Sequence, residues 1–440
     1  ESLWKTFSSE GTGTGKTFTI SGWVKRTELG GIDIFMGVGR DVGGDANDGA
    51  IRFNSDQFQF VNFASNAYNV RTNAVFRDTS AWYHIMVAVD TTQATDSNRV
   101  KLYVNGEQQT SLTGTAYPTQ NYQFKWGRAE EHMIGARPDS DATAGVAQVN
   151  QFWSGYMADV YFIDGLQLAP TDFGEYDEDS GIWKPIEVED VTYGTNGFYL
   201  DYTDGSDLGN DANGSNNFAE NNLTAADQAF DTPTNNFCTL NPLYNCSTVP
   251  MTDGNTNCDR TDNGNSTVRG TFVVTSGKWY WEVHVGKGSI NSNYPFSGMT
   301  GNLTLDPCTW VHQDAQTFSV SGSGNVTDVS THRGTGTAAA TSNATPAYSI
   351  YGLAVDIDNQ TLLWYTNGVA NNSGNTYSIA NSVSASTEGM TPMVFLFTGA
   401  QQSFNFGGYS IYLPSSAQSD ANGYGNFEYA VPSGFYALCT

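Results

Sequence analysis

The sequence has little positive charge and no long apolar run. Of its 440 residues, 19 are Lys or Arg and 45 are Asp or Glu, so the formal net charge is −26 at pH 7. A nucleic-acid partner is not expected, because an acidic surface repels the phosphates that a basic one would neutralise. Membrane insertion is not expected either, because no apolar run approaches the roughly 20 residues that span a bilayer.

Helical periodicity is also missing from the chain. Short segments of alternating apolar and polar residues lie between clusters of Gly, Asn, Asp, Ser and Thr. Hydrophobic residues make up 39% and aromatic residues 13%, which is too apolar for a disordered chain. The composition therefore predicts an all-β protein of the sandwich or barrel type, long enough for two domains.

One phrase occurs twice in the chain. "WYHIMVAVD" followed by "VKLYVNG" (82–106) is echoed by "YGLAVDID" followed by "TLLWYTNG" (351–368), and the phrases end on Asn-Gly pairs at 105–106 and 367–368. Each copy predicts two antiparallel strands closed by a tight turn. Because a lone hairpin is marginal in water, two distant copies predict two all-β domains.

These patterns divide the chain into three parts. We expect a first unit at 1–170, a connector rich in Asp, Asn and Gly at 171–240, and a second unit at 241–440. "GTNGFYLDY" (194–202) predicts a strand within the connector, packed on one of the domains.

The best strand patterns place every second side chain on one face. The apolar sets are Phe18, Ile20, Gly22 and Val24 in the first strand pattern, Phe152, Tyr156, Ala158, Val160 and Phe162 near residue 160, and Trp279, Trp281, Val283 and Val285 in the second unit. In the last of these, Lys278, Tyr280, Glu282 and His284 occupy the opposite, polar face.

Five cysteines are present, four of them clustered in the second half. Cys238, Cys246, Cys258 and Cys308 can form two disulfides in three possible connectivities, or remain buried thiols in a reducing compartment; Cys439 is next to last. We favour disulfides because three of the four lie in one polar, turn-rich insertion. We also favour a disulfide over a zinc site for these residues, because the sequence has no paired C-x-x-C motif.

Asparagine sequons are candidate modification sites. Nine Asn-x-Ser/Thr matches occur, at Asn213, Asn222, Asn245, Asn265, Asn302, Asn325, Asn343, Asn359 and Asn371. A eukaryotic secretory route would glycosylate exposed sequons. The alternative is that a region rich in Asn, Ser and Thr produces such matches by chance.

Two aspartate-rich stretches are candidate Ca²⁺ sites. "DVGGDANDG" offers Asp41, Asp45 and Asp48, and "DYTDGSDLGNDANG" offers Asp201, Asp204, Asp207 and Asp211. Ca²⁺ takes six to eight oxygen ligands, and neither stretch has the spacing of a helix–loop–helix site. We favour turn formation, since Asp side chains bond the local backbone, and keep Ca²⁺ as the alternative cofactor.

Two tryptophans are candidate sugar contacts. Trp126 in "YQFKWGR" and Trp310 in "DPCTWVHQD" lie near loop segments, where an exposed indole can stack on a pyranose ring. The commoner alternative is a partly buried loop anchor.

Catalytic patterns are weak. The loop "EGTGTGKTFTI" (10–20) resembles a phosphate-binding loop, but Glu10 stands where a glycine is needed and a strand follows instead of a helix. Glycan hydrolysis needs two carboxylates across a cleft. Glu187 and Glu189, in the connector, come nearest to such a carboxylate pair. Glu282 lacks a second carboxylate, because His284 stands two residues further on.

Longer motifs carry a family resemblance. "RTNAVFRDTSAWYHIMVAVDTTQATDSNRVKLYVNG" (71–106) and "MADVYFIDGLQLAPTDFGE" (157–175) resemble a family of marine phage structural proteins with a laminin-G-like, concanavalin-type jelly roll. "YGLAVDIDNQTLLWYTNGV" (351–369) and "VPSGFYALCT" (431–440) resemble the SPRY-like domain that often follows it. The resemblance covers most of the chain and departs from the family around 244–262 and 286–346, where long loops would determine partner choice.

The resemblance implies two concanavalin-like jelly-roll sandwiches in tandem, on a virion surface or outside the cell. It implies a non-catalytic fibre, spike or decoration protein that binds carbohydrate or other virion subunits. By analogy with fibres, we expect a homo-oligomer, with a trimer as the natural symmetry. The alternatives are a glycan-degrading enzyme of the same fold, which would depend on Glu187 or Glu282, and an architectural subunit of an extracellular filament.

Overall fold

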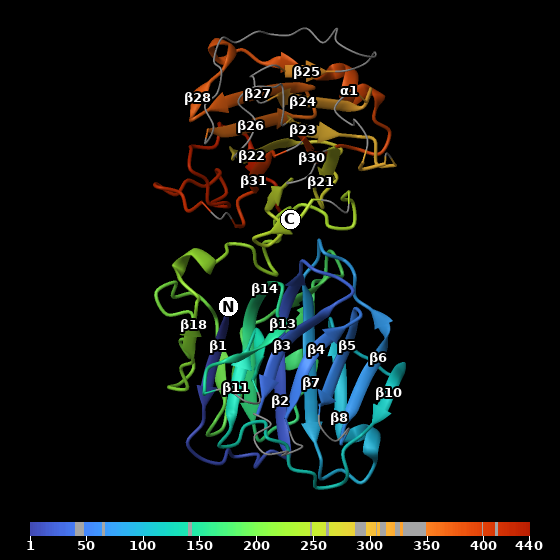
Figure 1. Cartoon of the computed structure of the whole chain (residues 1–440), viewed down its shortest axis with the longest axis vertical. Coiled ribbons are helices and arrows are strands. Elements are labelled where there is room, and N and C mark those ends of the chain that lie inside the picture. The colour runs from blue at the N-terminus through green and yellow to red at the C-terminus, as the bar shows by residue number, and fades with distance from the viewer. Residues whose placement is uncertain are drawn as a thin grey trace. The chain divides into compact units, whose positions relative to one another are not determined.

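The computed structural model divides the chain into two compact units, Glu1–Gln228 and Ala229–Thr440 (Figure 1). It describes every residue except 40–47, 64–66, 140–142, 247–248, 261–263, 287–295, 305, 309–313, 322–325, 329–348, 398 and 410–411. The all-β prediction is confirmed. In the described part the helices are α1 (Ala380–Ala385) and four single 3₁₀ turns at Asp96–Asn98, Pro170–Asp172, Ala225–Asp227 and Asn372–Gly374. None of them has the length and apolar character that crossing a membrane requires.

The first unit consists of two antiparallel sheets and two short ribbons. In spatial order, the eight-stranded sheet holds β10 (Leu112–Ala116), β6 (Asn69–Val75), β5 (Gln57–Asn62), β4 (Gly49–Asn54), β3 (Ile32–Val38), β11 (Glu131–Ile134), β1 (Ser2–Thr6) and β18 (Ala219–Asn221). The six-stranded sheet holds β17 (Phe198–Leu200), β14 (Gly155–Asp164), β2 (Thr17–Arg26), β7 (Tyr83–Asp90), β8 (Val100–Val104) and β9 (Glu107–Gln108). The ribbons pair β12 (Ala136–Pro138) with β13 (Ala147–Phe152), and β15 (Gly174–Tyr176) with β16 (Trp183–Pro185).

The core of this unit lies between the two sheets, as the alternating patterns predict. The inward side chains include Phe18, Ile20, Val24, Ile85, Val87 and Val89 from the six-stranded sheet and Phe53, Phe58, Phe60 and Val70 from the eight-stranded sheet. Gly22 shares the inward face of β2, where an added Cβ would lie 2.6 Å from Cζ of Phe35. The glycine therefore lets a phenylalanine from the opposite sheet pack against the strand.

Residues 171–228 belong to the first unit and do not form a separate connector. Strand β17 pairs with β14 along Phe198–Leu200, and β18 pairs with β1. Phe198, Leu200 and Phe218 are core residues. The high Asp, Asn and Gly content of this segment reflects turns between short strands rather than a free linker.

The second unit also consists of two sheets. The nine-stranded sheet runs through β19 (Met251–Thr252), β20 (Asn257–Asp259), β31 (Gln401–Asn405), β22 (Lys278–Val285), β26 (Ile350–Asp356), β27 (Thr361–Thr366) and β28 (Val369–Ala370), with β29 (Tyr377–Ser378) beside β27 and β32 (Tyr436–Ala437) parallel to β22. The five-stranded sheet orders β21 (Asn265–Arg269), β30 (Thr391–Phe397), β23 (Phe296–Thr300), β24 (Thr317–Ser321) and β25 (Val326–Asp328).

Strand β22 is buried on both faces. Trp281, Val283 and Val285 point into the main core, as predicted. Tyr280 on the other face packs in a second cluster with Phe427 and Ala437, which come from the C-terminal segment. The face that carries Lys278, Tyr280, Glu282 and His284 in the sequence pattern is therefore covered in part by the end of the chain.

The two units repeat one strand arrangement. The order β14-β2-β7-β8-β9 in the first unit corresponds to β31-β22-β26-β27-β28 in the second. The repeated phrase forms β7–β8 and β26–β27, both antiparallel pairs. The antiparallel pairing is confirmed in both units, but the Asn-Gly turns join β8 to β9 and β27 to β28 rather than closing these pairs.

Candidate functional site

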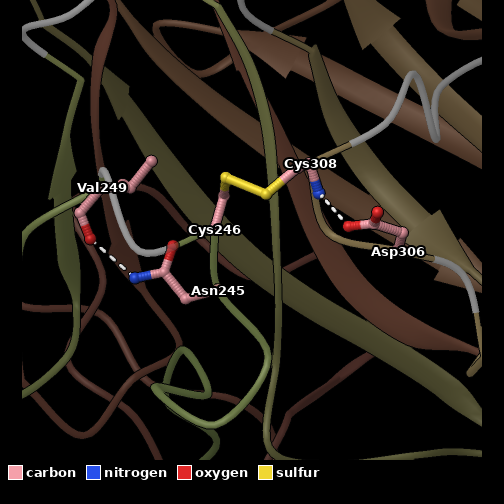
Figure 2. Close-up of a disulfide and its surroundings, with 5 residues drawn as sticks. All are labelled: Asn245, Cys246, Val249, Asp306 and Cys308. Atoms are coloured by element: carbon pink, nitrogen blue, oxygen red, sulfur yellow. Dashed lines mark hydrogen bonds between the residues drawn. A yellow bond between two sulfur atoms is a disulfide. The ribbon is translucent and has the colours of Figure 1, made fainter.

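A disulfide joins two loops of the second unit. Cys246 and Cys308 are bonded, with 62 positions between them in the sequence and 5.1 Å between their Cα atoms. Figure 2 shows the bond linking the segment that carries Asn245 and Val249 to the one that carries Asp306. We call residues 241–246, 301–304 and 306–308 the disulfide-linked loop pair.

Only one of the two expected disulfides is formed. Cys238 and Cys258 are free and buried, and Cys439 is free and half-buried. The Cys238 thiol donates to the carbonyl of Thr239, and the Cys258 thiol to that of Gln402. Burial raises the pKa of Cys258 to about 12, so this thiol is inert.

Hydrogen bonds hold each loop together and join the second loop to strand β21. The Asn245 amide donates to the Val249 carbonyl at 2.6 Å, and the Asp306 carboxylate accepts the Cys308 N–H at 2.8 Å, as Figure 2 shows. The Thr267 N–H of β21 donates to the Pro307 carbonyl at 2.7 Å. The second loop therefore covers the edge of the five-stranded sheet, where an open strand would invite pairing with another chain.

Arg269, the last residue of β21, ties the two loops together. Its guanidinium lies 3.3 Å from the ring centroid of Tyr244 and donates to the Asn302 carbonyl at 3.3 Å. The Asn302 amide in turn donates to Asp314 at 3.1 Å. Leu243, which precedes Tyr244 in the sequence, has 63% of its surface exposed. The loop pair thus presents an exposed apolar side chain, a guanidinium and amide groups, which suits binding rather than proton transfer.

The predicted metal ligands do not come together in the described residues. Asp48 is buried and pairs with Arg137 at 3.3 Å, while Asp41 and Asp45 lie outside the described residues. Asp201, Asp204 and Asp211 accept N–H groups of residues two positions ahead, and Asp207 donates its own N–H to the Asp204 carbonyl. No group of three His, Cys, Asp or Glu suited to a metal occurs in the described part. These contacts are those of turns, and Ca²⁺ binding remains a prediction.

The first tryptophan is not a surface contact. Trp126 is 0% exposed and packs in the core between Phe18 and Phe60, so the prediction that it stacks on a sugar is wrong. The segment "YQFKW" reads as a loop but supplies core side chains at Phe124 and Trp126. Trp310 lies outside the described residues, two positions after Cys308 in the sequence.

The sequons differ in exposure. Asn213, Asn222 and Asn359 are exposed, Asn245, Asn265 and Asn302 are half-buried, Asn371 is buried, and Asn325 and Asn343 lie outside the described residues. The Asn371 amide donates to the Trp364 carbonyl and the Thr366 hydroxyl. A glycan at Asn371 is incompatible with this packing.

One serine–histidine pair has the spacing of a nucleophile and base. Ser21 Oγ and His84 Nε2 are 2.7 Å apart. However, the Trp183 indole N–H, which can only donate, points at Nδ1 of His84 at 3.1 Å. Nδ1 is therefore the acceptor, and Nε2 carries the proton that it donates to Ser21. Burial lowers the pKa of His84 to about 3, so the ring is neutral and in the wrong tautomer to deprotonate the serine.

The glycine-rich loop is occupied by a carboxylate of the chain itself. The Thr12 and Gly13 N–H groups donate to the two oxygens of Asp164 at 2.6 and 2.7 Å, and the Asn196 N–H donates at 3.1 Å. A nucleotide phosphate would need these same donors. The loop is a structural turn that docks on the end of β14.

The candidate catalytic glutamates take other roles. Glu187 and Glu189 are both exposed, after β16. Glu282 is buried, and its carboxylate accepts the Glu428 and Tyr429 N–H groups, each at 2.8 Å. Glu282 therefore anchors the C-terminal segment that covers β22.

Comparison with known proteins supports a lectin-type fold for the first unit. Residues 4–166 match the family described as the concanavalin A-like lectin/glucanases superfamily. A search of curated proteins found no significant match.

Solved structures of other proteins are similar in fold. The SPRY domain of human HERC1 is 15% identical, covering 38% of this chain and 96% of that one, with a TM-score of 0.30. The heptameric SAP-like pentraxin of Limulus polyphemus is 15% identical, covering 38% and 71%, with a TM-score of 0.29. The CBM40 of the Ruminococcus gnavus IT-sialidase is 16% identical, covering 38% and 93%, with a TM-score of 0.26.

Proposed function

We propose that the protein is a non-catalytic virion-surface protein, a fibre, spike or decoration, that binds host glycans or other particle subunits through loops of its sandwiches. The observation that carries this proposal is the Cys246–Cys308 bond. Structural disulfides are typical of proteins exposed to oxidising surroundings, outside the cell or on a particle. The bond also holds two loops in one arrangement, which lowers the entropy cost of ordering them on a partner.

The lectin-type family match of residues 4–166 supports carbohydrate as the partner class. In the second unit, the loop pair offers Leu243 for an apolar sugar face, and Arg269 and Asn302 for hydroxyl groups. We further propose a homo-oligomer, with three copies as in a fibre, which light scattering of the purified chain would test.

A glycan array tests binding at the loop pair. Leu243→Ser is expected to lower the affinity for the bound glycans about tenfold, because a contact of this size contributes roughly 1.5 kcal/mol or more. Val369→Ser is the matched control, since Val369 is a similarly exposed apolar residue of the same unit, at 70% against 63% for Leu243. Equal loss in both variants would contradict a role for the loop pair.

The surface location and the lack of catalysis need separate measurements. Immunogold labelling of purified particles is expected to place the chain on their surface. The bound glycans are expected to remain intact, with no reducing ends released. A chain absent from particles that binds no glycan, or one that cleaves what it binds, would overturn the proposal.

A further inference from the structure

Three polar side chains form a row across the outer face of the first unit's eight-stranded sheet. Arg52 of β4 lies opposite Gln59 of β5, and Gln59 lies opposite Arg71 of β6. These three strands are neighbours, as Figure 1 shows. The residues on either side of Arg52 and of Gln59 point into the core, so the row faces away from it.

A third guanidinium reaches the same face. Arg137, on ribbon strand β12, lies over Gly37 of β3, where an added Cβ would come within 2.4 Å of the arginine's own Cβ. Both Arg137 and Arg52 place their guanidinium groups over the ring of Phe63, at 4.2 and 5.0 Å from its centroid. We call Arg52, Arg71 and Arg137 the arginine face.

In the part of the chain that the structure describes, the ion pairs do not match these charges one for one. Arg137 pairs with Asp48 at 3.3 Å. Arg52 donates to the Gln59 side-chain oxygen at 2.8 Å, and Arg71 to the Asn54 carbonyl at 2.9 Å. Neither Arg52 nor Arg71 forms an ion pair within the described part of the chain. Nε of Arg71 is buried and has no hydrogen-bond partner there.

Placing these arginines together on one face is energetically unfavourable, although the chain as a whole is acidic. Burial, together with the nearby charges of Arg137 and Arg71, lowers the pKa of Arg52 to about 10. With 45 acidic and 19 basic residues, carboxylates to pair with these arginines are plentiful in the sequence. Within the described residues, Asp48 is the carboxylate paired with these three like charges, and an external anion would relieve their repulsion further.

The guanidinium groups are already oriented for such an anion. Gln59 is itself buried and is held by three contacts, accepting from Arg52 and Asn54 and donating to Asn69. A guanidinium stacked on an aromatic ring keeps its in-plane N–H groups free to form the paired bonds that carboxylate and sulfate groups favour.

We propose that the arginine face binds a glycan bearing acidic sugars, either carboxylated or sulfated. Arg52 and Arg71 are two strands apart, about 10 Å, so they match two anionic groups on one polymer rather than a single small ion. The net charge of −26 disfavours densely charged polyanions such as nucleic acid, whereas a glycan with spaced acidic sugars meets less repulsion. Phe63, a half-buried ring beside both Arg52 and Arg137, offers apolar surface for a sugar ring.

This inference rests on the proposed glycan binding and names its chemical class. Titration calorimetry of the full chain would use an oligogalacturonate, a sulfated oligosaccharide, a neutral oligosaccharide of matched length and sodium sulfate. The acidic oligosaccharides are expected to bind, more weakly as salt rises, and Arg52→Gln or Arg71→Gln to lower their affinity about tenfold each. Arg128→Gln removes the same charge elsewhere in the unit, from a partly exposed pair with Glu10, and is expected to change the affinity less than twofold.

Conservative variants keep the test decisive if a glutamine variant fails to fold. Arg52→Lys and Arg71→Lys retain the charge but lose the planar fork, and are expected to bind several-fold more weakly. Equal binding of acidic and neutral oligosaccharides, equal effects of Arg71→Gln and Arg128→Gln, or competition by sulfate ions at the oligosaccharide's own concentration would overturn the inference. Binding of neutral glycans alone would leave the proposed function standing, whereas binding of no glycan removes the basis for both.

Discussion

Asn105 and Asn367 occupy the same position in the two units. Oδ1 of Asn105 accepts the His84 N–H at 2.8 Å, and Oδ1 of Asn367 accepts the Ile350 N–H at 2.9 Å. Each asparagine also returns its own N–H to the carbonyl of that same partner. Both have positive φ angles, 49° and 48°. The repeated Asn-Gly pair is thus one structural device used twice, and it belongs to the hairpin rather than to a binding site.

The turn asparagines should be more sensitive to alanine than to glycine. Asn367→Ala loses the side-chain acceptor and places a Cβ-bearing residue without local hydrogen bonds at positive φ, which we expect to cost about 2 kcal/mol of unfolding free energy. Asn367→Gly loses the acceptor alone and should cost about 1 kcal/mol. Urea denaturation measures both, and equal losses would mean that the backbone conformation contributes nothing.

Removing the Cys246–Cys308 bond should destabilise the second unit. A cross-link across 62 positions restricts the unfolded chain by about 4 kcal/mol in the chain-entropy treatment. We expect a lower melting temperature in dithiothreitol, and the same decrease in a Cys246→Ser, Cys308→Ser double variant. The double variant is its own control, because reductant should not lower its melting temperature further. A wild-type melting temperature unaffected by reductant would contradict a stabilising disulfide.

Expression through a eukaryotic secretory route should modify only some sequons. Asn213 and Asn222 are exposed and are expected to carry glycans, as measured by mass spectrometry of the folded product. Asn371 is 6% exposed, with its amide bound to Trp364 and Thr366, and is expected to be unmodified in that product. A glycan at Asn371 in folded protein would show that this turn does not pack as described.

Period-two patterns predicted the strands well but not their irregularities. The expectation that Phe152, Tyr156, Ala158, Val160 and Phe162 share a face is wrong. Phe152 ends a separate strand, β13, and the register of β14 shifts between Ala158 and Tyr161. Asp159 adopts a φ of 49° at this bulge. Val160 and Phe162 point into the core, and before the bulge it is Met157 that packs against it. An aspartate inside an apolar run is a weak sign of a bulge, and alternation alone cannot locate one.

The polar positions of the strands were harder to interpret than the apolar ones. In "GAIRFNSDQFQF" the apolar residues predict the strands, yet the same alternation puts Arg52 and Gln59 on the outer face. Arg52 and Gln59 lie near Arg71 and Arg137 because of strand pairing and the β12–β13 ribbon. No local sequence pattern predicts either of these. Similarly, Trp183 contacts His84 from 99 positions away. Long-range pairing of this kind is set by the packed fold.

Glu282 should make the stability of the second unit depend on pH. Burial raises the pKa of its carboxyl to about 7, and this outweighs the hydrogen bonds from the Glu428 and Tyr429 N–H groups and the Tyr280 hydroxyl. The folded pKa lies above the unfolded value of about 4.3, so the folded state holds the proton more tightly. This contribution is fully present below about pH 4 and is lost as the pH rises through 7.

We therefore expect wild-type protein to lose about 3 kcal/mol of unfolding free energy relative to Glu282→Gln between about pH 4 and 7.5. The glutamine keeps one acceptor for the C-terminal segment and does not titrate, so the difference between the two pH profiles isolates this carboxyl. Glu388→Gln, at an exposed position of the same unit, provides the baseline. Parallel profiles for wild type and Glu282→Gln would mean that the three hydrogen bonds outweigh burial and keep the carboxylate ionised throughout.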